Sequence, residues 1–194
     1  MSGIPETRFR EMADGDIDFA VHLVQAAGWA SESRETFEAF LAHDRQGCFV
    51  AETAGLPAGL CCATRYRENG FIGELIVARK ARILGLGRQL FGRAVEYLHA
   101  GGVTNIFLDG DLNAVPFYES QGFRKICRSL RFRGRIAGRK HAHVRRLRPD
   151  DLDSICALDR ELFGDDRSFF LRRRAGIPGN PGFVSVKDGR IHGY

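Results

Sequence analysis

One segment, residues 71–100, constrains the fold of this chain more than any other. It begins with an apolar run, Phe71-Ile72-Gly73-Glu74-Leu75-Ile76-Val77, that has the length and composition of a buried strand. It ends in a stretch whose apolar residues recur every four positions, as on one face of a helix: Leu86, Leu90, Ala94 and Leu98. Between the two lies a short loop that contains Gly85 and Gly87. The segment therefore predicts a strand, a glycine-containing loop and a helix in succession.

The loop has the properties of a phosphate-binding site. The first amides of a helix have no intrahelical partner, and the helix dipole places partial positive charge there. Gly85 and Gly87 let the backbone approach a ligand closely, and Arg82 and Arg88 can add charge-assisted hydrogen bonds. The simpler alternative is a turn in which the glycines only bend the backbone. A dinucleotide fingerprint and a P-loop are excluded, because Leu90 replaces the third glycine and no G-K-[ST] follows.

A second motif follows after a further predicted strand and reads Asn113-Ala114-Val115-Pro116-Phe117-Tyr118-Glu119-Ser120-Gln121-Gly122-Phe123. It matches the form A-x-x-[FL]-Y-E-x-x-G-F. Together with the R-x-x-G-x-G loop that starts at Arg82, it resembles the GNAT superfamily of N-acetyltransferases. The resemblance implies an α/β (α+β) fold with a mixed, mostly antiparallel, splayed sheet flanked by helices.

The remaining elements are expected in the order that this fold requires. Strands are predicted near residues 7–12, 48–53, 58–65, 71–77 and 104–109, and Phe123 to Arg135 is expected to be extended again. Helices are predicted after Asp14-Gly15-Asp16, after Ser33 or Glu35, from Leu86 to Ala100, and over residues 113–121.

The resemblance implies that acetyl-CoA is the cofactor. The pantetheine arm pairs with the strand backbone of Ile76 and Val77, and the N–H of Val77 polarises the thioester carbonyl. The pyrophosphate lies on the loop amides. The implied cofactor-binding residues are Ile76, Val77, Arg82, Ile83, Leu84, Gly85, Leu86, Gly87, Arg88, Asn113 and Phe117.

The implied proton donor to the departing thiolate is Tyr118, for which a tyrosine packed in the core is the alternative. Glu74, expected on the strand face of Ile72 and Ile76, and Asp109, at the end of the next strand, are candidates to deprotonate the amine through a water. Either can instead be a non-catalytic polar residue near the site. Trp29 is expected to border the groove for the acceptor substrate, with core packing as its alternative.

The motifs depart from the family pattern in three places. Arg79 stands where many members have proline, and Ile83 stands where glycine is common. Asp111 stands where the family often has an asparagine, and Asn113 can take over the role of that asparagine. Because an acid near phosphates is unfavourable, we expect only modest affinity for CoA.

Composition narrows the possible partners. The 194 residues are 44% hydrophobic and 27% charged, with no apolar run of membrane-spanning length and a charged N-terminus, so we expect a cytoplasmic protein without membrane contact. The five cysteines include no C-x-x-C pair, so neither disulfides nor a metal site are expected.

The net charge of +5 is concentrated between Arg124 and Arg148, a stretch without acids. Arg131, Arg133 and Arg135 alternate with other residues, as on a strand with one solvated basic face. A surface for an acidic partner or nucleic acid is the alternative. Because no pattern of stacking aromatic residues accompanies the charge, nucleic acid is not an expected partner.

The tail of the chain resembles its head. Residues 9–18 match residues 144–153, and Phe49-Val50 matches Phe183-Val184 at nearly the same offset. We therefore predict an acetyl-CoA-binding domain over residues 1–138 and the N-terminal part of a second, tandem GNAT-like unit over residues 139–194. Its last strand, which begins at Arg190, leaves an unpaired edge, so this part is expected to pack on the first domain or on a second chain, as in a homodimer. An accessory cap over the acceptor groove is the alternative.

These observations predict an N-acetyltransferase that transfers an acetyl group from acetyl-CoA to a primary amine of a small molecule or peptide by direct attack. The alternative is that the chain is a non-catalytic module that binds acyl-CoA and serves as a regulator or a scaffold. The sequence does not identify the acceptor amine.

Overall fold

The computed structural model describes residues 5–29, 33–130, 132, 134–135, 138, 140–179 and 181–194. Its larger sheet has five strands in the order β1-β2-β3-β4-β5. Neighbouring strands from β1 to β4 are antiparallel, whereas β4 and β5 are parallel. The strands are β1 (Thr7–Glu11), β2 (Cys48–Thr53), β3 (Leu56–Arg65), β4 (Asn69–Val77) and β5 (Asn105–Phe107).

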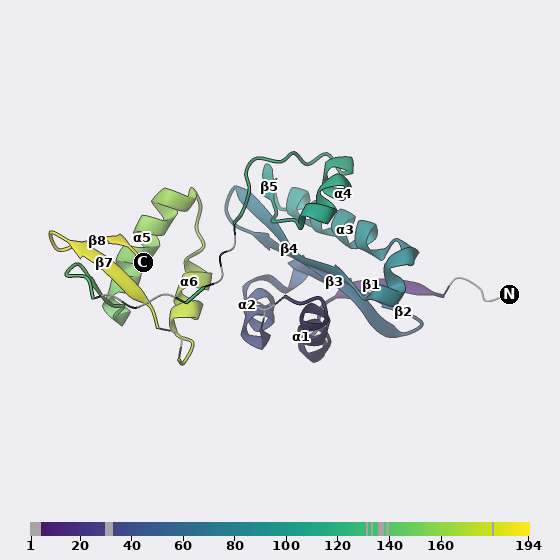
Figure 1. The fold of residues 1–194 in the computed structure, drawn as a ribbon. Helices are drawn as coiled ribbons and strands as arrows, with labels where there is room; N and C mark the ends of the chain where they lie inside the picture. Colours follow the sequence, from purple (N-terminus) through teal and green to yellow (C-terminus); the bar gives the residue numbers. More distant parts are fainter. Residues whose placement is uncertain are drawn as a thin grey trace.

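Helices cover both faces of this sheet (Figure 1). One face carries α1 (Ile17–Ala26) and α2 (Arg34–Asp44), and the other carries α3 (Leu86–Ala100) and α4 (Val115–Ser120). Side chains along β3 alternate between the two layers, so that Leu60 and Cys62 pack with α1 and α2 while Cys61 and Ala63 pack with α3. The predicted fold class, a mixed and mostly antiparallel sheet flanked by helices, is confirmed.

Strand β4 contains a bulge that the sequence does not reveal. Cys62 pairs with Gly73 and Leu60 pairs with Ile76, so Glu74 and the residue after it stand opposite a single residue of β3. Glu74 has a φ of 53°, in the left-handed region. The extra residue reverses the alternation: Ile72 packs on the α3 side and Ile76 on the α1 side. The expectation that Ile72, Glu74 and Ile76 share one face is therefore wrong.

The end of the first part of the chain also differs from expectation. Strand β5 covers only Asn105–Phe107, shorter than the predicted strand over 104–109. Residues 123–130 form no strand, so the extended segment predicted from Phe123 to Arg135 pairs with no neighbour over its described residues. Ile126 and Leu130 are consequently exposed. Arg131 and Arg133, on which the alternation depends, lie outside the described residues, and the alternation stays a prediction.

A separate three-stranded sheet follows in the order β6-β7-β8, from β6 (Val144–Arg146), β7 (Phe183–Lys187) and β8 (Arg190–Gly193). Helices α5 (Leu152–Phe163) and α6 (Ser168–Ala175) lie between β6 and β7 in the chain. The strand that begins at Arg190 pairs with β7. We call residues 140–194 the C-terminal segment.

The two sheets begin with the same local structure. Arg10 on β1 forms a bidentate ion pair with Asp16, at 2.6 and 2.8 Å, and Asp16 accepts a hydrogen bond from the amide of Ala13. In the C-terminal segment, Arg145 and Asp151 form the same bidentate pair at 2.6 and 2.7 Å, and Asp151 accepts from the amide of Arg148. In each case the carboxylate lies in a short 3₁₀ turn that leads directly into a helix.

The C-terminal segment packs on the first part of the chain, as expected for a sheet with open edges. Phe170 of α6 contacts Phe40 of α2 at a ring distance of 6.0 Å, and Arg173 pairs with Glu38 at 3.6 Å. Figure 1 shows α6 as the helix of the C-terminal segment that lies nearest to α2. Within the described part of the chain, no helix combines the length and apolar character needed to cross a bilayer.

Candidate functional site

The parallel strands β4 and β5 join at one end and part at the other. Their pairing consists of three residue pairs, Asn69 with Asn105, Gly70 with Ile106 and Phe71 with Phe107. Beyond Phe71, β4 continues for six more residues to Val77, while β5 ends at Phe107. Among the described residues, no strand therefore pairs with the β5 side of residues 72–77, and we call this unpaired backbone edge the cleft. We call the three pairs the pivot of this cleft.

The pairing of β3 and β4 determines which backbone groups face the cleft. The amide of Ala78 donates to the carbonyl of Ala58 at 2.8 Å, and the next register pair is Gly59 with Val77. Hydrogen-bonded and non-hydrogen-bonded pairs alternate in an antiparallel ladder, so the N–H and C=O of Val77 point away from β3. The same alternation turns the backbone of Ile76 toward Leu60. The predicted backbone role of Val77 is compatible with this register, whereas that of Ile76 is not, since Ile76 is buried beside α1.

The N-terminus of α3 lies directly after the open end of β4. The chain passes from Val77 through a 3₁₀ turn (Arg79–Leu84) to Gly85, whose φ of 70° is in the region that favours glycine, and Leu86 begins the helix. No side chain among the described residues caps this helix N-terminus. The first-turn amides of α3 are therefore available to an anion.

Basic side chains surround this helix N-terminus. Arg82 donates from Nε to the outward-facing carbonyl of Val77 at 3.1 Å, which ties the loop to the end of β4. Arg82 and Arg88 are exposed, as are Arg79 and Lys80, which sequence analysis did not assign to the site. The side chain of Ile83 is 91% exposed. Leu84 and Leu86 pack into the core on the α3 side and fix the loop on the sheet.

Tyr118 extends from α4 toward the sheet. Its ring contacts Phe91 of α3 at 5.6 Å, and a Cβ at Gly110 would lie 2.7 Å from Tyr118 Cε2, so the loop after β5 accommodates this ring only with glycine there. Burial raises the pKa of Tyr118, and the nearby Cys61 and Asp111 add to the increase. The phenol is therefore protonated at neutral pH and can act as a proton donor.

Glu74 lies close to the same region. The Cys61 thiol, on β3 opposite the bulge, interacts electrostatically with both Glu74 and Tyr118, and burial raises its own pKa. Cys61 therefore lies near both the Glu74 bulge and the Tyr118 phenol. Neither Cys61 nor Gly110 was among the predicted site residues, because a buried thiol and a loop glycine carry no functional pattern in sequence.

The remaining predicted residues surround the cleft less closely. Asp109 follows β5 and is exposed, and Asn113 is exposed in the 3₁₀ turn before α4. Phe117 stacks edge-on against Phe91 at 5.6 Å. Trp29 packs on the core beside α1 that also contains Ile76, next to residues 30–32, which lie outside the described residues. This core contact favours packing as one role of Trp29.

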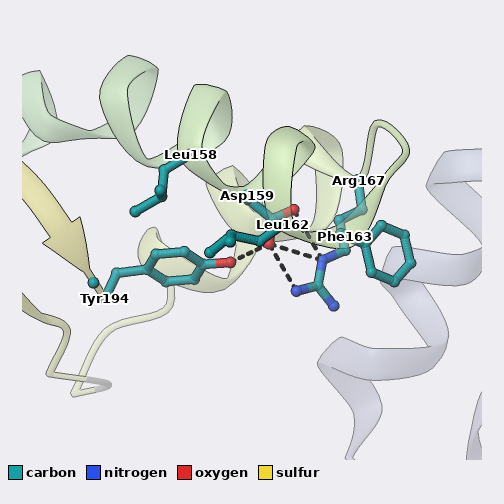
Figure 2. A pocket seen from close by; sticks show the side chains of 7 residues that line it. Leu158, Asp159, Leu162, Phe163, Arg167 and Tyr194 are labelled. Atoms are coloured by element: carbon teal, nitrogen blue, oxygen red, sulfur yellow. Dashed lines mark hydrogen bonds and ion pairs between the residues drawn. The ribbon is translucent and has the colours of Figure 1, made fainter.

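A different cavity, of about 410 Å³, lies in the C-terminal segment between α5 and the end of β8. Figure 2 shows its polar side chains joined in one network, in which Arg167 and the Tyr194 hydroxyl both donate to Asp159. The Arg167 guanidinium also lies 4.2 Å from the centre of the Phe163 ring. These groups satisfy one another, and the cavity is built from elements other than those of the β4–β5 cleft.

The comparisons with known proteins agree with the fold. Residues 16–123 match the model of the acetyltransferase (GNAT) family. A putative acetyltransferase from Pyrococcus horikoshii has a similar structure, with a TM-score of 0.72 and 24% identity, covering 95% of this chain and 69% of that one.

Two further solved structures resemble the first part of the chain. The ribosomal-protein-S18-alanine N-acetyltransferase from Escherichia coli has a TM-score of 0.56 and 22% identity over 63% of this chain and 80% of its own. AAC(6')-Iy, in complex with the bisubstrate analog CoA-S-monomethyl-acetylneamine, has a TM-score of 0.55 and 17% identity over 68% of this chain and 99% of its own. At these identities the likeness shows the fold. Since the family model spans more than half of the chain, this protein belongs to the GNAT family of acetyltransferases.

Proposed function

We propose that the protein transfers the acetyl group of acetyl-CoA to a primary amine of a small molecule or peptide by direct attack. The observation that carries this proposal is the position of the uncapped α3 N-terminus, immediately after the strand that borders the open cleft. A diphosphate and an extended arm require these two features side by side.

The residues present fit acetyl-CoA. The outward N–H of Val77 can donate to a carbonyl of the acyl-CoA arm, while the Val77 carbonyl accepts from Arg82 Nε. The first-turn amides of α3 and the basic side chains around them favour a diphosphate. When bound, acetyl-CoA supplies an acetyl thioester whose carbonyl carbon is open to attack by an amine.

Five residues of the chain then have distinct tasks. The Val77 N–H donates a hydrogen bond to a carbonyl oxygen on which negative charge develops. Tyr118, kept protonated by burial, donates its proton to a thiolate leaving group. Glu74 and Asp109 are the candidates to accept the proton of the amine, each through a bridging water, and Trp29 borders the acceptor side.

The acceptor class is supported by the similar structures. One is an enzyme for the alanine of a ribosomal protein, and another was solved with an analog that joins CoA to an acetylneamine. The first is a peptide amine and the second a small-molecule amine. We therefore keep both classes as candidate acceptors.

The direct test is a calorimetric titration of the full chain with acetyl-CoA, followed by an amine panel in which released CoA thiol is measured. We expect saturable binding at one site and thiol release that depends on at least one amine. Absence of acetyl-CoA binding would overturn the proposal. Binding without transfer to any amine would favour the regulatory or scaffold alternative.

Gly87→Ala distinguishes a ligand-binding loop from a simple turn. An alanine Cβ at Gly87 would lie 3.7 Å from Val77 Cγ2, an ordinary contact, and at an unstrained position Gly→Ala stabilises a protein by about 0.4–1 kcal/mol because the unfolded chain loses freedom. We expect Gly87→Ala to raise thermal stability and yet weaken acetyl-CoA binding by about tenfold, or about 1.4 kcal/mol, because the methyl group keeps a phosphate from the amides.

Gly92→Ala, in the same helix, is the matched control. Nothing lies within 4 Å of its added Cβ, so it should be equally stabilising and leave binding unchanged. Differential scanning fluorimetry and calorimetry on both variants provide the comparison. Equal affinities in the two variants would contradict close approach of the ligand at Gly87.

We also propose that residues 1–138 form the acetyl-CoA-binding domain and that residues 139–194 begin a second, tandem unit of the same ancestry. The repeated Arg-Asp pairs, at residues 10 and 16 and at residues 145 and 151, support this duplication. The order strand, helix, helix, strand, strand is also the same in both parts. Residues 136, 137 and 139, beside the proposed boundary, lie outside the described residues.

A further inference from the structure

One carboxylate of the C-terminal segment binds the turn between β3 and β4. Asp165 lies between α5 and α6 and is 5% exposed. Its Oδ1 accepts a hydrogen bond from the amide of Arg67 at 3.0 Å. Its Oδ2 accepts from the amides of Glu68 and Asn69, each at 3.0 Å, and from Asn69 Nδ2 at 3.1 Å. A single side chain therefore holds three consecutive backbone amides of another part of the fold.

Asp165 is ionised at any ordinary pH. Burial by itself would raise its pKa, but the backbone hydrogen bonds from Asp166, Glu68, Arg67 and Asn69 outweigh burial and lower the pKa to about 2. Hydrogen bonds to an ionised acceptor are stronger than neutral ones. We call the hydrogen bonds between the Asp165 carboxylate and the amides of residues 67–69 the clasp. The clasp is thus present throughout the pH range in which an acetyltransferase is assayed.

The turn that Asp165 binds is also the base of the cleft. Asn69 is the first residue of β4 and pairs with Asn105 in the pivot. The carbonyl of Glu68 accepts a hydrogen bond from the amide of Thr104, directly before β5, at 3.3 Å. The turn itself is closed by a bond from the amide of Tyr66 to the carbonyl of Asn69 at 2.9 Å. Strand β4 therefore starts at backbone that Asp165 binds, and the residue before β5 is hydrogen-bonded to the same turn.

Aromatic packing surrounds this clasp and keeps the contact apolar at its border. Tyr66 stacks edge-on against Phe163 of α5 at 5.3 Å. His43 of α2 lies 4.8 Å from Phe170 of α6 and contacts the carbonyl of Arg65 through Nε2 at 3.3 Å. The C-terminal segment thus contacts the β3–β4 turn from two helices.

Small rotations at the pivot produce large displacements in the cleft. Val77 is six residues after Phe71, which at about 3.3 Å per residue places it at most about 20 Å from the pivot. At that distance, a change of about 5° in the direction of the chain after β5 relative to β4 corresponds to a displacement of up to about 1.7 Å. Displacements of about 1 Å are enough to impair binding and catalysis strongly.

We propose that Asp165 is a positioning residue for the cofactor: by fixing the β3–β4 turn, it sets the angle at the pivot and hence the width of the acetyl-CoA cleft. This inference rests on the proposed function. It gives the C-terminal segment, which contributes no group to the cleft, a direct role in the affinity of the first part for its cofactor.

The first test compares Asp165→Asn with Asp153→Asn in the full chain. Asp153 forms an exposed ion pair with Arg172 inside the C-terminal segment and contacts nothing at the turn, so it is the matched control. In Asp165→Asn an NH₂ group replaces one of the two accepting oxygens and faces N–H donors. We expect the Kd and KM for acetyl-CoA to rise at least about fivefold, the lower end of typical coupling between sites, with a smaller change in kcat at saturation.

The outcomes of this test separate the two proposals. Wild-type protein that does not bind acetyl-CoA overturns the proposed function itself. Wild-type binding together with unchanged Kd in Asp165→Asn overturns only the positioning role. A variant that merely loses folded protein would lower the number of binding sites in the titration and leave the Kd of the remainder as it was, which also counts against positioning.

Hydrogen exchange on the wild-type protein is a second test that needs no variant. Coupling between sites is reciprocal, so acetyl-CoA must strengthen the clasp if the clasp strengthens binding. We expect acetyl-CoA to slow exchange at residues 66–71 and at Asp166 to Ser168. Unchanged exchange in the Asp165 region, with protection confined to the α3 N-terminus, would contradict the inference.

Discussion

Tyr118→Phe is expected to lower kcat by about 10²–10⁴, the usual contribution of general acid catalysis. Phenylalanine keeps the ring that packs on Phe91 and Phe117, so the shape of α4 should not change. The phenol donates no hydrogen bond to any described residue, and its removal therefore breaks no contact in the fold. The expected loss is confined to the proton that the leaving thiolate requires.

The measurement is thiol release under saturating acetyl-CoA, with an amine identified in the panel. Calorimetry should show the same acetyl-CoA affinity in Tyr118→Phe and wild type. Tyr97→Phe is a suitable control, because it removes a half-buried tyrosine hydroxyl that donates to Asp44 at the far end of α3. An unchanged kcat in Tyr118→Phe would show that another group or water protonates the thiolate.

The main elements of the fold could be predicted because they depend on local patterns. The four-residue repeat from Leu86 to Leu98 is the buried face of α3, and all of its members are inaccessible to solvent. Gly85 has a positive φ, a backbone conformation that glycine adopts more readily than other residues. Periodicity and glycine chemistry are properties of short stretches, so the sequence contains them directly.

The details of the site depended instead on strand pairing. Nothing in the letters of residues 71–77 indicates that Glu74 adopts a φ of 53° and forms a bulge against β3. That one residue decides which side chains face α3 and which backbone amides face the cleft. A pairing register arises from two strands together, and the alternation of a single strand cannot reveal it.

Long-range contacts were the least predictable part. Asp165 precedes Asp166 and Arg167 after a helix, a polar stretch that resembles an ordinary helix end. Its partners are almost a hundred residues earlier in the chain, and they are backbone amides, which no residue type identifies. The segment predicted to be extended from Phe123 to Arg135 illustrates the reverse case, since its described residues pair with no strand.

Phe91→Ala should have the largest effect on stability, with the free energy of unfolding lowered by about 3–5 kcal/mol. Phe91 is 1% exposed on α3 and contacts the rings of Phe117, Tyr118 and Phe123 at 5.3 to 5.6 Å. Truncation removes the side chain and leaves a cavity among three aromatic residues. Urea unfolding followed by circular dichroism measures the loss, and Phe132→Ala, at a side chain that is 91% exposed, should change stability by less than about 0.5 kcal/mol.

The same substitution connects the core to the chemistry. Because Phe91 supports the ring of Tyr118, its truncation should reduce kcat in the protein that remains folded. The N-terminus of α3 begins five residues before Phe91, and its backbone amides are not changed by the substitution. We therefore expect Phe91→Ala to lower kcat more than acetyl-CoA affinity when both are measured below the unfolding transition. Equal losses in the two quantities would mean that Phe91 supports the whole cleft, and an unchanged kcat would show that Tyr118 is held in place by Gly110 and α4 alone.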